Sequence, residues 1–187
     1  MRITGGKARG IKLDAPRDNQ IRPATDSSRE ALFSSLGELP PQMRFLDLFA
    51  GTGSYGLEAW SRGSRGGVFV EKNRSLIPYL KANIERVGKS AGTSPSGILV
   101  VQRDVFKWHP SESSPFDLIF CDPPYDKWDD WAEPLFALMG NLLSPLGCIV
   151  LEQPADMKIC LPGFERVKRL GKKRPRSPSL TIWKQAR

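Results

Sequence analysis

The sequence predicts one α/β domain built on a doubly wound, mostly parallel sheet with helices on both faces. From residue 44 onward, short apolar runs that suit buried strands alternate with longer runs that suit helices, and this alternation favours parallel pairing. The chain has 187 residues, 40% of them hydrophobic, which is enough for one compact core and a short appendage. We therefore expect an N-terminal arm and helix, residues 1–43, and a main domain, residues 44–187.

The first 43 residues suit a small hairpin followed by a helix. Residues 1–24 are rich in glycine, proline and arginine, and "RITGGKARGIKL" alternates weakly, which predicts a short hairpin or arm laid against the main domain. The segment "SSREALFSSLGEL" then predicts a helix. Ser27 can cap this helix, with Glu30 three residues on, and the prolines at 40 and 41 end it.

The main domain is expected to hold seven strands. Five apolar runs predict parallel strands, and two basic segments near the end predict a closing antiparallel pair, so that the C-terminal strand is antiparallel to the rest. The predicted strands cover residues 44–50, 66–72, 98–104, 116–121, 147–153, 163–173 and 179–185, and the intervening helices cover 54–63, 75–88 and 131–143.

A glycine-rich turn follows the first predicted strand. Gly51, Gly53 and Gly56 have G-x-G-x-x-G spacing between that strand and a helix, a pattern that lets the chain turn tightly and approach a nucleotide closely. A single match is weak, because a glycine turn can also simply join a strand to a helix.

Acidic residues at three successive strand ends decide between possible ligands. Asp47 lies beside the glycine turn, where it would repel the pyrophosphate of a dinucleotide but attract the ammonium group of S-adenosylmethionine. Glu71 can accept hydrogen bonds from ribose hydroxyls, and Asp104 from an adenine amino group. Each alone could be a solvated strand end, but together they predict a binding site for S-adenosylmethionine, at which Val105 is a further expected contact.

The fourth predicted strand ends in "DPPY", Asp122 to Tyr125. Asp122 and the carbonyl of Pro123 can each accept one N–H of an exocyclic base amine, which localises the nitrogen lone pair toward a methyl donor. Pro123 and Pro124 stiffen the corner, and Tyr125 offers a ring on which a flipped-out base can stack. The alternative is a proline-rich turn without a catalytic role.

Other aromatic, basic and sulfur-containing residues give weaker indications. Trp128 and Trp131 could line a base pocket or fill the core, and we assign His109 no role. The three cysteines, Cys121, Cys148 and Cys160, are expected to be reduced core residues, and neither they nor any histidine cluster indicates a metal site.

Charge predicts a polyanionic partner. The net charge is +8 and the pI about 9.6, which favours RNA or DNA, although a charge cluster can also be only a solvated surface. No apolar segment suits a signal peptide or a membrane span, so we expect a cytoplasmic monomer with no membrane contact. The basic residues gather in two groups: Arg2, Lys7, Arg9, Lys12, Arg17 and Arg22, and Arg166, Lys168, Arg169, Lys172, Lys173, Arg174 and Arg176.

These motifs resemble a known family. "DLFAGTGSYGLEA", "VEK" and "DPPY" are similar to the motifs of class I S-adenosylmethionine-dependent methyltransferases, and "ITGGKARGIKL" with "RPATDSSREALFSSL" resembles the opening arm and first helix of the RsmD type. The resemblance implies a Rossmann-like class I methyltransferase fold and methylation of N2 of a guanine, guanine 966 in that family, in 16S ribosomal RNA. It also implies that Thr25, Asp26 and Arg29 border the site.

Three functions follow as hypotheses. The first is an S-adenosylmethionine-dependent rRNA guanine-N2 methyltransferase acting on ribosomal RNA, expected in a small-subunit assembly intermediate. The second is a DNA adenine-N6 methyltransferase, because the same corner suits either exocyclic amine. The third is an rRNA-binding assembly factor without catalysis. The intact glycines and the intact "DPPY" favour an enzyme.

Overall fold

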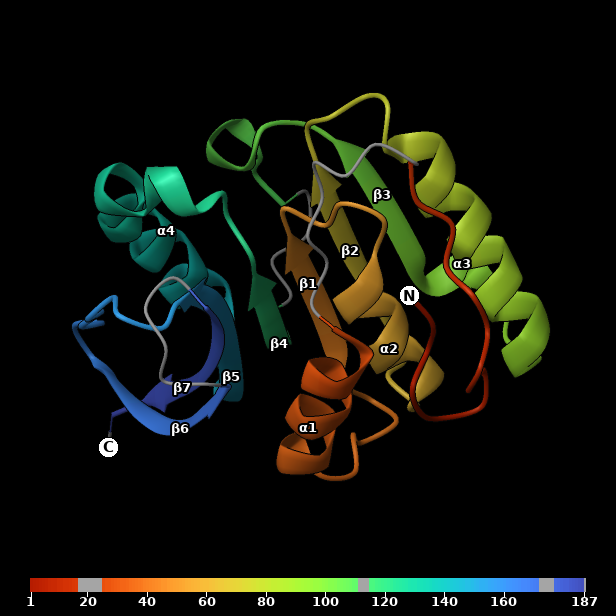
Figure 1. Cartoon of the computed structure of the whole chain (residues 1–187), viewed down its shortest axis with the longest axis horizontal. Coiled ribbons are helices and arrows are strands. Elements are labelled where there is room, and N and C mark those ends of the chain that lie inside the picture. The colour runs from red at the N-terminus through yellow and green to blue at the C-terminus, as the bar shows by residue number, and fades with distance from the viewer. Residues whose placement is uncertain (17–24, 111–114, 172–176, 187) are drawn as a thin grey trace.

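The predicted seven-stranded, mostly parallel sheet is confirmed (Figure 1). The computed structural model describes residues 1–16, 25–110, 115–171 and 177–186. Its strand order is β3-β2-β1-β4-β5-β7-β6, with β1 to β5 parallel and β7 antiparallel to both β5 and β6. The strands are β1 (Arg44–Leu48), β2 (Gly66–Glu71), β3 (Ile98–Gln102), β4 (Phe116–Cys121), β5 (Leu143–Pro154), β6 (Phe164–Gly171) and β7 (Pro178–Gln185).

Helices connect the parallel strands. The α-helices are α1 (Asp26–Leu36), α2 (Ser54–Ser61), α3 (Ile77–Ala91) and α4 (Trp128–Leu142), and three short 3₁₀ helices are η1 (Pro95–Gly97), η2 (Val105–Lys107) and η3 (Tyr125–Lys127). In Figure 1, α4 lies apart from α1, α2 and α3, on the other side of the sheet.

Two apolar cores form because successive residues of a strand point to opposite faces. Phe45 packs in the first core with α1, α2, α3 and the N-terminal arm, whereas Leu46, the next residue, packs in the second core with α4. β2 and β4 are divided in the same way, which explains why their sequences read as continuous apolar runs.

The strand order changes direction at β1. From β1 the chain proceeds outward through β2 and β3, then returns to place β4 on the other side of β1. The ends of β1 and β4 are therefore neighbours, with Leu48 opposite Cys121. In open α/β sheets, ligands bind in the crevice at this switch point, outside the carboxyl ends of the strands.

The N-terminal arm is fastened to the outer surfaces of α2 and α3. The backbone N–H and the hydroxyl of Thr4 donate to the buried carboxylate of Glu58 in α2. Asn83 in α3, also buried, accepts from the backbone N–H of Asp14 at 2.7 Å and donates to its carbonyl at 3.0 Å. Within the arm, the predicted hairpin is reduced to one antiparallel bridge between Arg2 and Lys12.

Several sequence-based boundaries were wrong, and the largest shift is in β5, which begins at Leu143, four residues earlier than expected. Thr25, not Ser27, caps α1, because its extended backbone lets its hydroxyl accept from the Ser28 N–H. That helix ends at Leu36, ahead of the two prolines, because Gly37 adopts φ 76°. Helix α4 begins at Trp128, three residues earlier than expected, and β5 follows it directly.

The cysteine prediction holds for two residues of three. Cys121 and Cys148 are buried, but Cys160 is exposed, so it is not a core residue. The apolar neighbours that suggested burial lie in the segment between β5 and β6, where Ala155 and Leu161 are buried but Met157 and Ile159 are only half-buried. Among the residues described, no helix is both long and apolar enough to cross a membrane, and no cluster of three potential metal ligands occurs.

Candidate active site

Acidic side chains gather at the carboxyl edge of the parallel strands. Asp47 is the penultimate residue of β1 and Glu71 the last of β2, while Asp104 lies two residues beyond β3 and Asp122 directly after β4. Since parallel strands end at the same edge of a sheet, the sequence prediction that these acids share one crevice agrees with the topology.

The glycine turn joins β1 to α2 at this edge. Gly51 and Gly53 have φ of 57° and 88°, values that favour glycine. A Cβ on Gly51 would meet nothing within 4 Å, so the turn presents bare backbone to open space there. Gly56 differs, because a Cβ there would clash with Phe45 and Phe69, and its role is close packing of α2 on the sheet.

Asp47 is a buried carboxyl group with one hydrogen-bond donor. Its Oδ2 accepts from the Gly56 N–H at 2.9 Å, and its side chain is almost inaccessible to water. Desolvation by burial raises the pKa of Asp47 to about 8, the Gly56 hydrogen bond opposes the rise, and the charge of Glu71 adds to it. A cation bound beside Asp47 would stabilise its ionised form.

Glu71 and Asp104 are held by backbone N–H groups. Glu71 accepts from Gly51 and Asn73, both at 2.7 Å, which ties the end of β2 to the glycine turn. Asp104 caps η2 by accepting from Phe106 at 3.0 Å. Each carboxylate oxygen has a second lone pair with which to accept from a ligand. Val105, the remaining predicted cofactor contact, is buried in the second core.

An aromatic cluster that the sequence did not indicate lies beside these acids. Trp131 of α4 stacks on Phe49 of the glycine turn, with ring centroids 5.8 Å apart, and meets the edge of Phe106 at 5.2 Å. The Lys72 ammonium lies 5.4 Å from the Trp131 ring. Trp128, in contrast, is 1% exposed and belongs to the core. Trp131 is thus the tryptophan that borders the crevice, through contacts with three of its loops.

The corner from Asp122 to Tyr125 continues from β4 into η3. Pro123 is buried and Pro124 exposed, while Asp122 and Tyr125 are half-buried. The Tyr125 hydroxyl donates to Glu152 Oε1 at 3.1 Å, so its ring is anchored at the far end. Desolvation raises the pKa of Asp122 well above its ordinary value, and the charges of Glu152 and Asp47 act in the same direction.

Glu152 is the site residue that sequence reasoning missed. It follows Leu151 in β5, and Leu151 pairs with Cys121, so Glu152 and Asp122 lie at equivalent positions on adjacent strands. The Tyr55 hydroxyl of α2 donates to Glu152 Oε2 at 2.5 Å. Burial raises the pKa of Glu152, whereas its two tyrosine donors oppose that rise. The available signal was one more acid closing an apolar run, in "GCIVLEQ".

The residues at the start of α1 link the N-terminal arm to this network. Arg29 is fully buried and donates to Asp26 at 2.7 Å and to the Arg2 carbonyl at 2.5 Å. Burial, chiefly, raises the pKa of Tyr55, and the positive charge of Arg29 partly offsets this rise. Arg29 therefore acts electrostatically on Tyr55, the donor to Glu152, while Thr25 serves as the helix cap.

Several residues of the two basic groups make contacts within the protein. Arg166 lies over the Trp183 ring, and Arg169 donates to the Ser179 hydroxyl and the Ala155 carbonyl. Arg2 forms an ion pair with Asp26. Six residues of these groups lie outside the described part of the chain, namely Arg17, Arg22, Lys172, Lys173, Arg174 and Arg176.

Comparison with known proteins identifies the family. The family described as "Conserved hypothetical protein 95" matches residues 1–181. The chain belongs to this family. Two curated relatives, both named "Ribosomal RNA small subunit methyltransferase D", come from Escherichia coli K12 and Haemophilus influenzae. The first is 35% identical over 125 residues, covering 67% of this chain and 60% of the relative, and the second is 32% identical over 164 residues, covering 87% and 83%. The resemblance found in the motifs is thus confirmed at the level of the family.

Solved structures show the same fold over nearly the whole chain. A hypothetical protein from Thermus thermophilus is 34% identical with a TM-score of 0.76, covering 97% of this chain and 98% of that one. The Escherichia coli protein yhhF is 25% identical with a TM-score of 0.81, covering 99% and 97%. The predicted Rossmann-like class I methyltransferase fold is confirmed.

The crevice suits S-adenosylmethionine by its own chemistry. Asp47 is a buried carboxyl group with a raised pKa, and the positive charge of the cofactor would stabilise its ionised form. The glycine turn at Gly51 leaves space for a ligand to approach the backbone closely. Glu71 and Asp104 are two further hydrogen-bond acceptors at the same edge. A dinucleotide pyrophosphate would meet these acids with like charge.

Proposed function

We propose that this protein transfers a methyl group from S-adenosylmethionine to the exocyclic N2 of a guanine in small-subunit ribosomal RNA. The observation that carries the proposal is that three cofactor-binding acids and the Asp122 corner meet at one sheet edge, at the switch point of the strand order. The ribosomal substrate is taken from the names of the relatives in the same family.

The cofactor half of the site comprises Asp47, Gly51, Gly53, Glu71 and Asp104. S-adenosylmethionine supplies a methyl group activated by a sulfonium. Asp47 is the acceptor for its ammonium group, Glu71 for the ribose hydroxyls and Asp104 for the adenine amino group. Trp131 and its stacked partner Phe49 shield this half from water.

The target half orients the base amine. Such an amine is a poor nucleophile, because its lone pair is delocalised into the ring. Asp122 and the Pro123 carbonyl each accept one N–H, which draws the lone pair out of conjugation, and Pro124 holds the corner rigid. Tyr125, anchored by Glu152, offers its ring to the extruded base.

Asp122 also has the properties of a proton acceptor. The methylated nitrogen must lose one proton, and a carboxylate whose pKa is raised by desolvation and by Glu152 binds that proton more readily than an ordinary aspartate. Raising the pH should therefore increase activity as Asp122 ionises.

The test uses small-subunit RNA from cells that lack this protein. Mass mapping before and after incubation with the purified enzyme and S-adenosylmethionine should reveal one guanine, with position 966 of 16S rRNA the first to examine, that gains a methyl group at N2. No methyl group gained by the rRNA, together with methyl transfer to N6 of adenine in DNA, would replace the proposal with the DNA adenine-N6 alternative. RNA binding without cofactor affinity by calorimetry would identify an assembly factor.

The remaining expectations concern context. We infer that the protein acts as a cytoplasmic monomer on an assembly intermediate of the small subunit. Comparing methylation of naked rRNA, partly assembled particles and finished subunits tests this, and sedimentation of the free protein reports its oligomeric state.

A further inference from the structure

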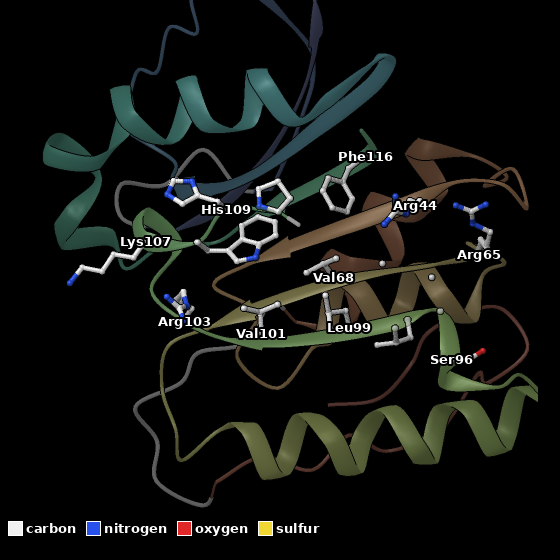
Figure 2. A pocket seen from close by; sticks show the side chains of 16 residues that line it. Arg44, Arg65, Val68, Ser96, Leu99, Val101, Arg103, Lys107, His109 and Phe116 are labelled. Carbon is white, nitrogen blue, oxygen red and sulfur yellow. The ribbon is translucent and has the colours of Figure 1, made fainter. Parts of the chain in front are cut away.

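A groove of about 790 Å³ lies on the sheet face opposite α2 and α3, and none of the predicted cofactor-binding or catalytic residues lines it. Figure 2 shows Arg44 and Arg65 at one end of it and Arg103 and Lys107 at the other. Since Arg44 and Arg65 mark the amino ends of β1 and β2, and Arg103 follows β3, the groove runs along the strands. It reaches the carboxyl edge next to Asp104.

The groove exists because the described residues of the connection from β3 to β4 leave this part of the sheet face uncovered. The described part of that connection, residues 103–110 and 115, contains only the three-residue η2. Parallel sheets usually have both faces buried, yet Leu99 of β3 is 51% exposed and Val101 half-buried. The floor of the groove is therefore apolar and open.

The rim of the groove is cationic. Among the residues that the structure describes, every charged side chain that lines it is an arginine or a lysine, and His109 adds a further nitrogen-bearing ring. Arg65, Arg103 and Lys107 are exposed, and none of them forms an ion pair within the part of the chain that the structure describes.

The nearest acid of β4 is directed elsewhere. Asp117 follows Phe116, which lines the groove, but its carboxylate accepts from the Arg44 backbone N–H at 2.9 Å and from the Ser144 hydroxyl at 2.8 Å. The Arg44 guanidinium lies over the Phe116 ring, 5.2 Å from its centroid. Cations above an apolar floor suit a ligand that combines phosphates with flat bases.

We propose that this groove binds a single-stranded segment of the RNA flanking the target nucleotide, an inference that rests on the proposed function. Arginine and lysine at its two ends contact phosphates, while the exposed apolar floor and His109 contact bases or riboses. The groove opens at the edge that holds the cofactor acids, so a strand whose target base is extruded at Asp122 continues along this face. The described members of the two basic groups noted in the sequence do not line it.

A pair of charge reversals tests the groove. The variant Arg65→Glu/Lys107→Glu changes its two ends, and Lys81→Glu/Lys89→Glu changes two exposed lysines of α3, on the opposite face. Both variants lower the net charge by the same amount, and Lys89 and Lys107 each lie in the last turn of a helix. Any difference between them therefore reports local contact rather than total charge.

We expect the groove variant to bind the rRNA substrate at least about 10-fold more weakly than the α3 variant, with the slope of log K against log salt reduced by about 1 to 2. KM for RNA should rise while kcat and the cofactor Kd stay within about 2-fold of wild type. Equal weakening in both variants, or none in either, would overturn the inference.

Further outcomes separate this inference from the proposed function. If the wild-type protein methylates rRNA and the groove variant does so with unchanged KM, only the groove inference fails. If wild type transfers no methyl group to rRNA, the proposed function fails first. If the groove variant lost affinity for an assembled ribonucleoprotein particle but not for naked rRNA, the groove would bind an acidic protein surface. That result would overturn the groove inference.

Discussion

The two halves of the crevice hold their acids in different ways. In the cofactor half, Glu71 and Asp104 accept hydrogen bonds from backbone N–H groups of loops at the same edge of the sheet, the glycine turn among them. In the target half, Glu152 accepts from the side chains of Tyr55 and Tyr125, which come from two other elements. The first arrangement is local and follows from strand geometry, whereas the second depends on how α2, β5 and η3 pack together. This difference predicts which substitutions affect binding and which affect the reaction.

The largest effect is expected at Asp122. Asp122→Ala removes one of the two acceptors for the amine and the group that receives its proton, so kcat should fall by about 10² to 10⁴, while cofactor affinity stays within about 2-fold. Labelled methyl transfer and calorimetry measure the two quantities. Asp126→Ala, four residues on and exposed, is the control and should retain full activity. If the Asp122→Ala enzyme kept full activity, Asp122 would have no role in the reaction, and the assignment of the target half would be wrong.

The next effect concerns cofactor binding at Glu71. Glu71→Ala deletes a charged acceptor that also fastens the glycine turn at Gly51, so cofactor affinity should weaken about 10- to 100-fold. RNA affinity should not change. Calorimetry with S-adenosylmethionine checks this, with the exposed Glu85→Ala on α3 as the control. An effect on RNA binding as large as that on cofactor binding would contradict the assignment of Glu71 to one half.

Asp47 should show opposite effects on stability and binding. Its pKa, about 8 in the folded protein, exceeds the ordinary value of 3.8. The folded state therefore retains a proton that the unfolded state releases, and the free energy of unfolding falls as the pH rises from about 4 to about 8. Asn carries no proton that titrates in this range, so the Asp47→Asn variant does not show this fall in the free energy of unfolding.

We expect Asp47→Asn, without ligand, to be more stable than wild type at pH 8 by several kcal/mol, up to about 5 for the full rise in the Asp47 pKa. The free energies of unfolding of the two proteins should become equal near pH 4. The variant should also bind the cofactor more weakly. Denaturant unfolding across this pH range is the measurement. A stability difference that does not depend on pH would mean that the Asp47 carboxyl is not the cause.

The smallest effect is expected at Glu152. Glu152→Gln keeps an acceptor for the tyrosines but removes a charge that raises the pKa of Asp122. We expect kcat to fall about 5-fold and the acidic limb of the pH profile to move to lower pH. Glu165→Gln, an exposed acid on β6, should leave the limb in place. A limb that does not move would show that Glu152 acts only by holding Tyr125.

The sequence was most informative where function follows from local position. The seven strands were predicted because buried parallel strands are continuous apolar runs, and Asp47, Glu71, Asp104 and Asp122 were found because each lies at or near the end of such a run. Helix ends were less accurate, since Thr25 and Ser27 are both good caps by composition and only the backbone decides between them.

Interactions between distant residues could not be predicted in this way. Tyr55 and Glu152 are 97 positions apart, so their hydrogen bond depends on the packing of α2 beside β5. The groove was missed for a related reason, because Arg44, Arg65, Arg103 and Lys107 are scattered along the chain and form a group only when three strands lie side by side.

The N-terminal arm also has a consequence for the order of folding. Thr4 bonds to a residue 54 positions away and Asp14 to one 69 positions away, so these contacts close long loops and carry a large entropic cost until α2 and α3 exist. During synthesis, residues 1–14 leave the ribosome before α2 and α3 but must wait until Asn83 has emerged. The arm is thus made before the helices that hold it and reaches its final position after them.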